Sequence, residues 1–422
     1  MLKKSALLSA GVAVVLSIAA CSEKLESGQS CPLLCPEQSV TLRDTTIDAV
    51  TSDTTVTGLP PIGSEAYMML ASHGDTVETR AIVRFDTLQQ HYTSHGLDSV
   101  VTKIDSAILV TPIIKPDSAH RPKSPVTIEV YDVDTTATDT VSSILGSLFR
   151  EDRLLGSKTF APESLLDTLR IPISTDTVLD RTVNGTRLRV GFRLLSAEGY
   201  DLQIGTIDIG AAVRLRVVTS AGDTAAAPIL NPPISRTPAD QPFLMQPLTD
   251  YTIVIKGQTG TQVNLLSVGG VPPRRAFMRF VVPSHIVDST TIVRATLLLT
   301  QSPNRRLTPR DSVFVYPVAI LASPTITDIA TLLTFTGQNG QFGLDSLRLA
   351  PGDSGLRSFE IVGLVRTWRG QPITVSPRTL ALRSGAEGQR PAQVDFFSSK
   401  APAAVRPRLR ITYVPQTSFG LP

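Results

Sequence analysis

Four short segments of this chain occur twice, in the same order. Each copy contains an Arg-Ala-x-x-Arg-Phe segment, an aliphatic segment, a Val-Tyr-x-Val segment and an Arg-Leu-Arg segment. The matched pairs are Arg80–Phe85 with Arg275–Phe280, Ser106–Val110 with Arg294–Leu298, Val130–Val133 with Val315–Val318, and Arg214–Val217 with Arg408–Ile411. A shared order of this kind indicates an internal duplication, so we expect two units built on one plan.

The repeated segments are short, aliphatic or β-branched, and bounded by turn-forming residues, which is typical of strands. With 28 Gly and 31 Pro, the 422-residue chain has too many helix breakers for long helices. Only Thr138–Leu148 and Ile361–Trp368 could form a turn or two of helix. We therefore predict an all-β fold of two tandem antiparallel β-sandwich (jelly-roll) domains.

Composition sets the predicted domain boundaries. Ala221–Phe243 is rich in Ala and Pro, as in an extended linker. Each flanking unit has about 170 residues, a length that can fold independently. The prediction is a signal peptide at 1–20, a tether at 21–40, a first sandwich at 41–219, a linker at 220–247, a second sandwich at 248–414 and a tail at 415–422.

The N-terminus has the three-part layout of an export signal. Lys3 and Lys4 precede an uncharged apolar run, Ala6–Ala20, which is shorter than the roughly 20 residues of a membrane-spanning helix. Leu16–Cys21 reads Leu-Ser-Ile-Ala-Ala-Cys and resembles the bacterial lipoprotein signal. In that family the Cys is acylated and becomes the first residue of the mature chain. The resemblance implies lipidation at Cys21 and membrane anchoring; the alternative is a plain secretory signal.

The residues after Cys21 concern location and redox state. The residue after Cys21 is Ser22 and not Asp. By resemblance to Gram-negative lipoproteins, this favours an outer-membrane, extracytoplasmic location. Cys31 and Cys35 are separated by three residues, unlike a Cys-x-x-Cys redox pair. In an oxidising compartment they could form a local disulfide. Free or intermolecular thiols remain the alternative.

The repeat also carries a family resemblance, clearest in the second copy. Besides Arg275–Phe280 and Val315–Val318, that copy has Glu360–Gly370, which contains Leu-Val-x-x-Trp, and Arg406–Tyr413, which reads Arg-Pro-x-Leu-x-Ile-x-Tyr. These segments resemble the secreted DNRLRE domain. The resemblance implies a jelly-roll sandwich akin to carbohydrate-binding modules.

Three residues of the second copy are candidate ligand contacts. Strand alternation places Ala276, Met278 and Phe280 on one face and the two anchor arginines, Arg275 and Arg279, on the other. Those arginines could bind an anionic ligand or pair with neighbouring carboxylates. Trp368 could stack on a sugar or cap the core. We favour the structural interpretation for all three, and we predict that the corresponding Ala81, Val83 and Phe85 also face the core.

Charge divides unevenly between the halves of the chain. Residues 1–225 contain 20 basic and 27 acidic residues, a formal charge of −7, whereas residues 226–422 contain 20 and 10, giving +10. Arginine supplies 18 of the latter 20, and its planar guanidinium suits carboxylates and phosphates. An acidic polysaccharide is therefore a candidate partner, although solvated charge or attraction between the halves would also explain the pattern. The total of +3 disfavours nucleic-acid binding.

No catalytic motif emerges from the sequence. Gly352–Gly355 reads Gly-Asp-Ser-Gly but lacks the Gly-Pro that follows in trypsin-like proteases, and it suits a turn. Asp132, Asp134 and Asp139 could hold a structural calcium, but no calcium-loop pattern follows, so we predict no cofactor. We expect a non-catalytic cell-envelope lipoprotein with a structural, adhesive or polysaccharide-binding role. The alternatives are a polysaccharide-degrading enzyme and a docking subunit of an envelope protein assembly.

Overall fold

The structure is a computed structural model. It describes residues 41–58, 63, 65–136, 141–220, 226–235, 248–258, 260, 262–320, 326, 344–371 and 378–415, and residues Arg43–Pro422 belong to one compact unit. The predicted signal peptide, Cys21, Cys31, Cys35 and the residues after Pro415 lie outside the described residues.

Antiparallel strands make up about half of the described chain and helices are few, which confirms the predicted all-β sandwich class. The helices are short: α2 (Ser142–Gly146), α3 (Thr175–Val183), α4 (Ser284–Val287) and α6 (Val362–Arg366), with 3-10 turns η1 (Glu151–Arg153), η2 (Pro162–Ser164) and η3 (Ile207–Ile209). Two of them, α2 and α6, lie within the segments where a turn of helix was expected. Helix α3 was not expected, although Ser174 caps it by accepting the Thr177 N–H at 3.2 Å.

The first sandwich module contains two facing sheets. One has the order β12-β3-β4-β11-β8-β9, with β15 also paired to β4; the other has the order β10-β7-β13-β14. The strands are β3 (Tyr67–His73), β4 (Val77–Phe85), β7 (Ser106–Pro112), β8 (Val126–Asp132), β9 (Leu154–Phe160), β10 (Thr168–Pro172), β11 (Leu188–Leu195), β12 (Tyr200–Gly205), β13 (Arg214–Val218), β14 (Ile229–Asn231) and β15 (Asp250–Lys256), besides a hairpin of β5 (His91–Ser94) and β6 (Leu97–Val100). Side chains from both sheets form one buried apolar cluster.

The second module repeats this plan. Its strands run β23-β16-β17-β22-β19-β20, with β2 paired to β17, and β21-β18-β24-β1; the long β18 also pairs with β23 and joins the two sets. The strands are β1 (Arg43–Ile47), β2 (Val50–Thr57), β16 (Leu265–Gly269), β17 (Arg274–Phe280), β18 (Thr290–Ser302), β19 (Val313–Ile320), β20 (Leu347–Leu349), β21 (Gly355–Glu360), β22 (Thr379–Ser384), β23 (Gln393–Phe397) and β24 (Arg408–Pro415).

The duplication seen in the sequence extends to strand register. In the first module Leu109 of β7 lies opposite Leu215 of β13, and in the second Leu297 of β18 lies opposite Leu409 of β24. These four residues occupy matching positions in the repeated segments. The inward faces of the anchor strands also agree with the prediction, because the Ala, aliphatic and Phe residues of β4 and β17 join the main cluster of their module.

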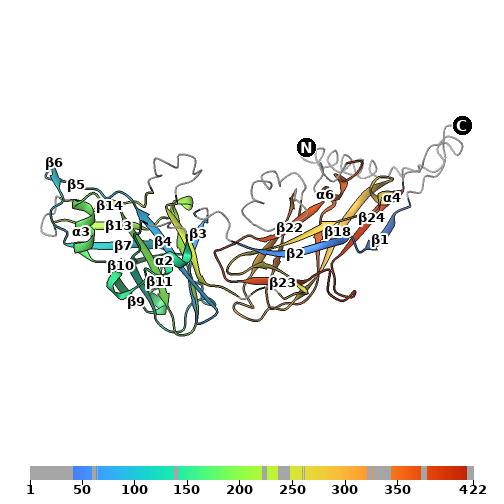
Figure 1. Cartoon of the computed structure of the whole chain (residues 1–422), viewed down its shortest axis with the longest axis horizontal. Helices are drawn as coiled ribbons and strands as arrows, with labels where there is room; N and C mark the ends of the chain where they lie inside the picture. The colour runs from blue at the N-terminus through green and yellow to red at the C-terminus, as the bar shows by residue number, and fades with distance from the viewer. Residues whose placement is uncertain are drawn as a thin grey trace, which may run out of the picture. The chain divides into compact units, whose positions relative to one another are not determined.

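Strand pairing differs from the predicted domain boundaries. The N-terminal strands β1 and β2 pair with β24 and β17 of the second module, and Figure 1 shows them in blue among its yellow-to-red strands. Conversely, β14 and β15 pair with β13 and β4 of the first module, although β14 lies in the predicted linker and β15 in the predicted second sandwich. Alternation reveals which face of a strand is buried, but not which edge the strand joins.

Candidate functional site

The outer face of β17 carries both anchor arginines of the second module. Because side chains alternate along a strand, Arg275, Phe277 and Arg279 point away from the main core that takes up Ala276, Met278 and Phe280. The two arginines have different surroundings, so the strand pattern alone does not assign their roles.

Arg275 is buried in an ion pair. Its side chain donates from Nε to Glu387 Oε1 at 2.7 Å and from a terminal nitrogen to Oε2 at 2.5 Å, and the residue is 2% exposed. This two-point geometry fully engages the carboxylate. Arg275 therefore holds the sheet to the segment around Glu387 and presents no surface to a ligand.

Trp368 is also part of the core. It follows α6, is fully buried, and its ring centroid lies 5.7 Å from that of Phe280. The indole packs within the main apolar cluster of the second module. Stacking on a sugar would require a ring face that this position does not offer.

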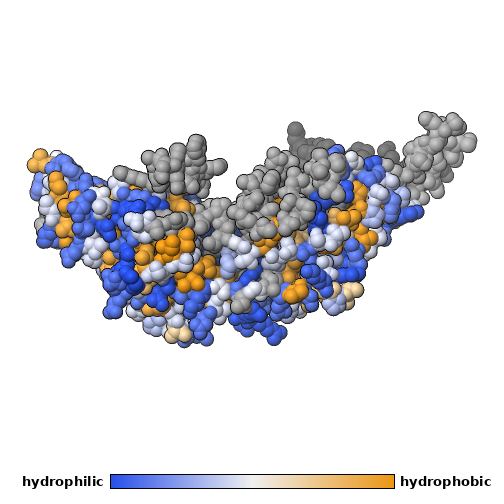
Figure 2. All heavy atoms as spheres, in the orientation of Figure 1, coloured by the Kyte–Doolittle hydropathy of each residue, from blue (hydrophilic) through white to orange (hydrophobic). Residues whose placement is uncertain are grey.

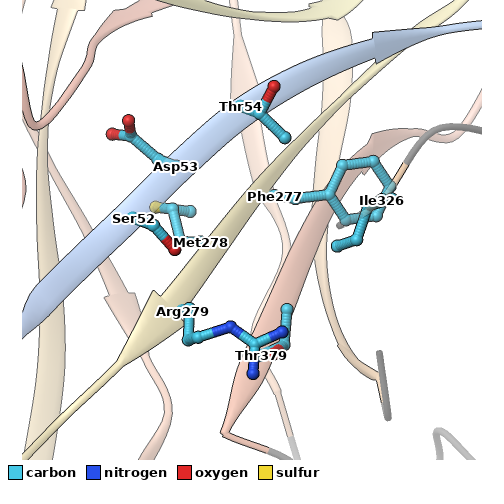
Figure 3. Close-up of a pocket in the computed structure, with 8 residues that line it drawn as sticks. All are labelled: Ser52, Asp53, Thr54, Phe277, Met278, Arg279, Ile326 and Thr379. Carbon is cyan, nitrogen blue, oxygen red and sulfur yellow. The ribbon is translucent and has the colours of Figure 1, made fainter. Parts of the chain in front are cut away.

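Arg279 lines a surface hollow of about 250 Å³ beside β2, β17 and β22 (Figure 3). Ser52 and Thr54 stand opposite Arg279 and Phe277 in the strand register, and Thr379 stands opposite Arg279 on the other side. These residues therefore share the outer face of the sheet. Asp53, Met278 and Ile326 complete the lining.

The hollow combines a cationic wall with hydroxyl groups over an apolar floor. Phe277 is only 2% exposed and packs with Val318, Ile320 and Ala381, so it shapes the floor rather than offering a ring face. The half-buried Arg279 guanidinium can donate two parallel hydrogen bonds to a carboxylate, and the exposed Ser52 and Thr54 can bond to ligand hydroxyls. Thr379 is buried and borders the hollow. The chemistry fits a hydroxylated, acidic ligand.

Two further hollows are linked to this one through shared lining residues. A hollow of about 190 Å³ shares Asp53 and Thr54 with the first and includes Lys400. Another of about 140 Å³ shares Gln262 and Leu265 with the second and includes Arg305 and Arg306. We call the three together the β2 row. The exposed cations Lys400, Arg305 and Arg306 suit an extended anionic polymer.

The acidic residues of the β2 row are held by hydrogen bonds. Asp53 accepts the backbone N–H of Ser399 at 2.5 Å and its hydroxyl at 2.9 Å. Asp395 accepts from Ser267 at 2.6 Å, Gln393 at 2.7 Å and Asn304 at 2.9 Å. Burial raises the pKa of Asp395 above its ordinary value, against the opposite effect of these bonds. Neither carboxylate is left as an exposed anion.

The candidate calcium ligands of the first module face arginines. Asp132 lies 2.9 Å from Arg181, and Asp134 lies 2.6 Å from Arg187; Asp139 is outside the described residues. These ion pairs occupy the oxygens that a calcium ion would need. The described residues hold no group of three or more His, Cys, Asp or Glu arranged for a metal ion.

Comparison with known proteins assigns no family. No protein-family model and no curated protein matches the chain. Among solved structures it is similar to the Macrobrachium rosenbergii nodavirus, at 9% identity over 90% of this chain and 92% of that chain, with a TM-score of 0.19. It is also similar to the infectious bursal disease virus VP2 subviral particle, at 9% identity over 89% and 77%, with a TM-score of 0.12. Scores this low support no functional inference.

The visible surface and the helices add two observations. On the face drawn in Figure 2, hydrophobic residues form separate patches among hydrophilic ones. Within the described ranges, each helix is too short or too polar to cross a membrane.

Of the residues that line the Arg279 hollow, the sequence pointed to Arg279 alone. Ser52, Thr54 and Thr379 were missed, because they reach the hollow through strand pairings between distant segments.

Proposed function

We propose that this protein is an extracytoplasmic bacterial lipoprotein whose second module binds an acidic polysaccharide without cleaving it. The observation that carries the proposal is the Arg279 hollow, where a guanidinium and three hydroxyl-bearing side chains surround one space. A uronic acid residue offers the matching groups, a carboxylate beside several hydroxyls. The β2 row would let neighbouring sugar units meet Lys400, Arg305 and Arg306.

Anchoring through Cys21 is the second part of the proposal. The residues before Cys21 resemble a lipoprotein signal, and acyl chains contribute about 0.8 kcal/mol for each buried methylene. A lipid anchor at Cys21 would hold the protein on the membrane, so the second module would be available to bind envelope polymer. Ser22 favours the outer membrane as the destination.

Binding to immobilised polysaccharides tests the site. We expect the full chain to bind a uronic-acid polymer more tightly than a neutral glucan, and Arg279→Gln to weaken binding by about tenfold, the effect of about 1.4 kcal/mol. The matched control is Arg294→Gln, which removes the same charge from a 67% exposed side chain paired with Glu360. Equal losses in both variants would show that net charge, and not the hollow, determines binding.

Mass spectrometry of the membrane fraction tests the anchor separately. We expect an acylated N-terminal Cys21 in the native protein and a soluble, unacylated protein after Cys21→Ser. Turnover of the bound polymer by the purified chain would contradict the non-catalytic role.

A further inference from the structure

Each module is completed by a two-stranded arm. The N-terminal arm, β1 and β2 (Arg43–Thr57), pairs with β24 and β17 of the second module. The middle arm, β14 and β15, pairs with β13 and β4 of the first. Since β24 corresponds to β13 and β17 to β4 in the duplication, the two arms occupy equivalent edges.

The two arms also share a short sequence pattern, which lies outside the four repeated segments. Asp53–Val56 reads Asp-Thr-Thr-Val and Asp250–Ile253 reads Asp-Tyr-Thr-Ile. The two Asp residues lie opposite Met278 and Val83, and the Thr at the third position of each segment lies opposite an anchor Ala. The arms therefore dock in the same register.

Side chains fix that register in the same way twice. Thr55 Oγ1 accepts the Ser267 N–H at 3.0 Å, and Thr252 Oγ1 accepts the Met69 N–H at 3.0 Å. Just as Asp53 accepts the Ser399 N–H, Asp250 accepts the Ile207 N–H at 2.9 Å. Both modules thus present one kind of docking edge for one kind of arm.

Each arm precedes one module in the sequence but pairs with the other module. Asp53 stands 27 residues before Arg80, and Asp250 stands 25 residues before Arg275, so each arm directly precedes the module that it does not join. The N-terminal arm docks on the second module although the chain runs on from it into the first, so its own contacts determine where it docks.

The N-terminal arm has features of an exchangeable segment. Only Ala49, Val50 and Val56 of its apolar side chains are buried, whereas most of its residues are exposed. Its acidic residues match the Arg-rich second module, because Asp44 accepts from Arg410 Nε at 2.8 Å and Asp48 pairs with Arg406. Backbone pairing and charge thus hold this arm, with little buried core.

We propose that the second module accepts the N-terminal arm of a second copy of this chain, so that two copies exchange arms. Exchange of identical elements forms the same contacts in a dimer as in a monomer, and therefore costs little. The middle arm stays within its own chain, because β14 begins at Ile229, shortly after β13 ends at Val218.

Disulfide trapping between two tagged copies tests the proposal. In full chains with Cys21, Cys31 and Cys35 replaced by Ser, one copy carries Thr46→Cys and the other Arg410→Cys, positions paired in the β1–β24 register. After the copies are mixed, unfolded, refolded and oxidised, we expect a disulfide-linked heterodimer. Arg410→Cys removes the Asp44 ion pair, while the β1–β24 backbone pairing and the Asp48–Arg406 pair remain to hold the arm.

The middle arm supplies the matched control. Leu230→Cys and Arg216→Cys occupy the equivalent pair on β14 and β13, and we expect no heterodimer from their mixture. The double variant Thr46→Cys/Arg410→Cys tests docking within one chain. A heterodimer yield well above that of the middle-arm control supports the proposal. A yield at or below the control overturns it, whatever the double variant shows.

Discussion

The outer faces of β4 and β17 show how one repeated strand serves two purposes. In the first module, Arg80 donates to Glu78 at 2.9 and 2.6 Å and stacks 4.3 Å from the Phe149 ring centroid. Phe149 and α2 belong to an apolar cluster over this face. In the second module the equivalent face carries the Arg279 hollow.

Two substitutions between the modules explain the difference at the second anchor arginine. Arg84 bonds to Asp86 at 3.0 Å and lies opposite Arg189, whereas the matching positions around Arg279 are Val281 and Thr379. A charged network therefore fills the first site, while a smaller, neutral pair borders the second. The same strand is therefore present in both modules, and the different residues around it leave a hollow beside Arg279 in the second module.

The largest expected effect is on the buried anchor arginine. Arg275→Ala leaves Glu387 buried without its ion-pair partner, so we expect a loss of about 3–5 kcal/mol in the free energy of unfolding. Urea denaturation would measure it, with Arg279→Ala as the control, for which we expect less than about 1 kcal/mol. Similar losses in both variants would contradict the different roles assigned to the two arginines.

A pH-dependent effect is expected at the middle arm. Burial raises the pKa of Asp250 to about 6, against the opposite effect of the bond from the Ile207 N–H. A carboxyl with a raised folded pKa stabilises the fold when protonated. The first module should therefore lose about 3 kcal/mol of stability as pH rises from about 4 to about 6.

Asp250→Asn removes this titration. We expect the variant to gain stability relative to the unaltered chain as pH rises through this window, measured by urea unfolding of both proteins at several pH values. Parallel pH profiles for the two proteins would contradict the burial of an ionisable Asp250.

The smallest expected effect comes from a variant that gives Arg279 the carboxylate partner that Arg84 has in the first module. Val281→Asp places a carboxylate where Asp86 stands relative to Arg84, at a side chain that is 50% exposed. The new carboxylate competes for the Arg279 guanidinium, so we expect about tenfold weaker binding of a uronic-acid polymer with little change in stability. Val281→Asn is the uncharged control in the same binding assay. Unchanged affinity of the Asp variant would separate Arg279 from ligand binding.

Much of the fold could be predicted because local pattern determines it. The alternation in Arg80–Phe85 and Arg275–Phe280 correctly identified the inward residues, and the duplicated segments form equivalent strands. Helix α3 was not predicted, because Ser174 and Asp176 mark its start within a polar segment that lacks a clear apolar period.

The candidate site was less predictable because it depends on pairings between distant residues. Glu387 lies 112 residues from Arg275, and no local pattern identifies it as the ion-pair partner. Ser52 and Thr54 join the hollow only because the N-terminal arm docks on β17. Both modules offer the same edge, so alternation could not assign either arm to its module.

The N-terminal arm has a mechanical consequence. It leads from Arg43 to the first module, and its backbone pairs with β17 and β24 of the second. Tension between Arg43 and the first module therefore runs through the arm and bypasses the second module's interior. Detachment of the 15 residues of Arg43–Thr57 would lengthen the chain by about 50 Å, while the other strands of the second module stay packed. The arm would therefore yield to a pulling force before the module unfolds.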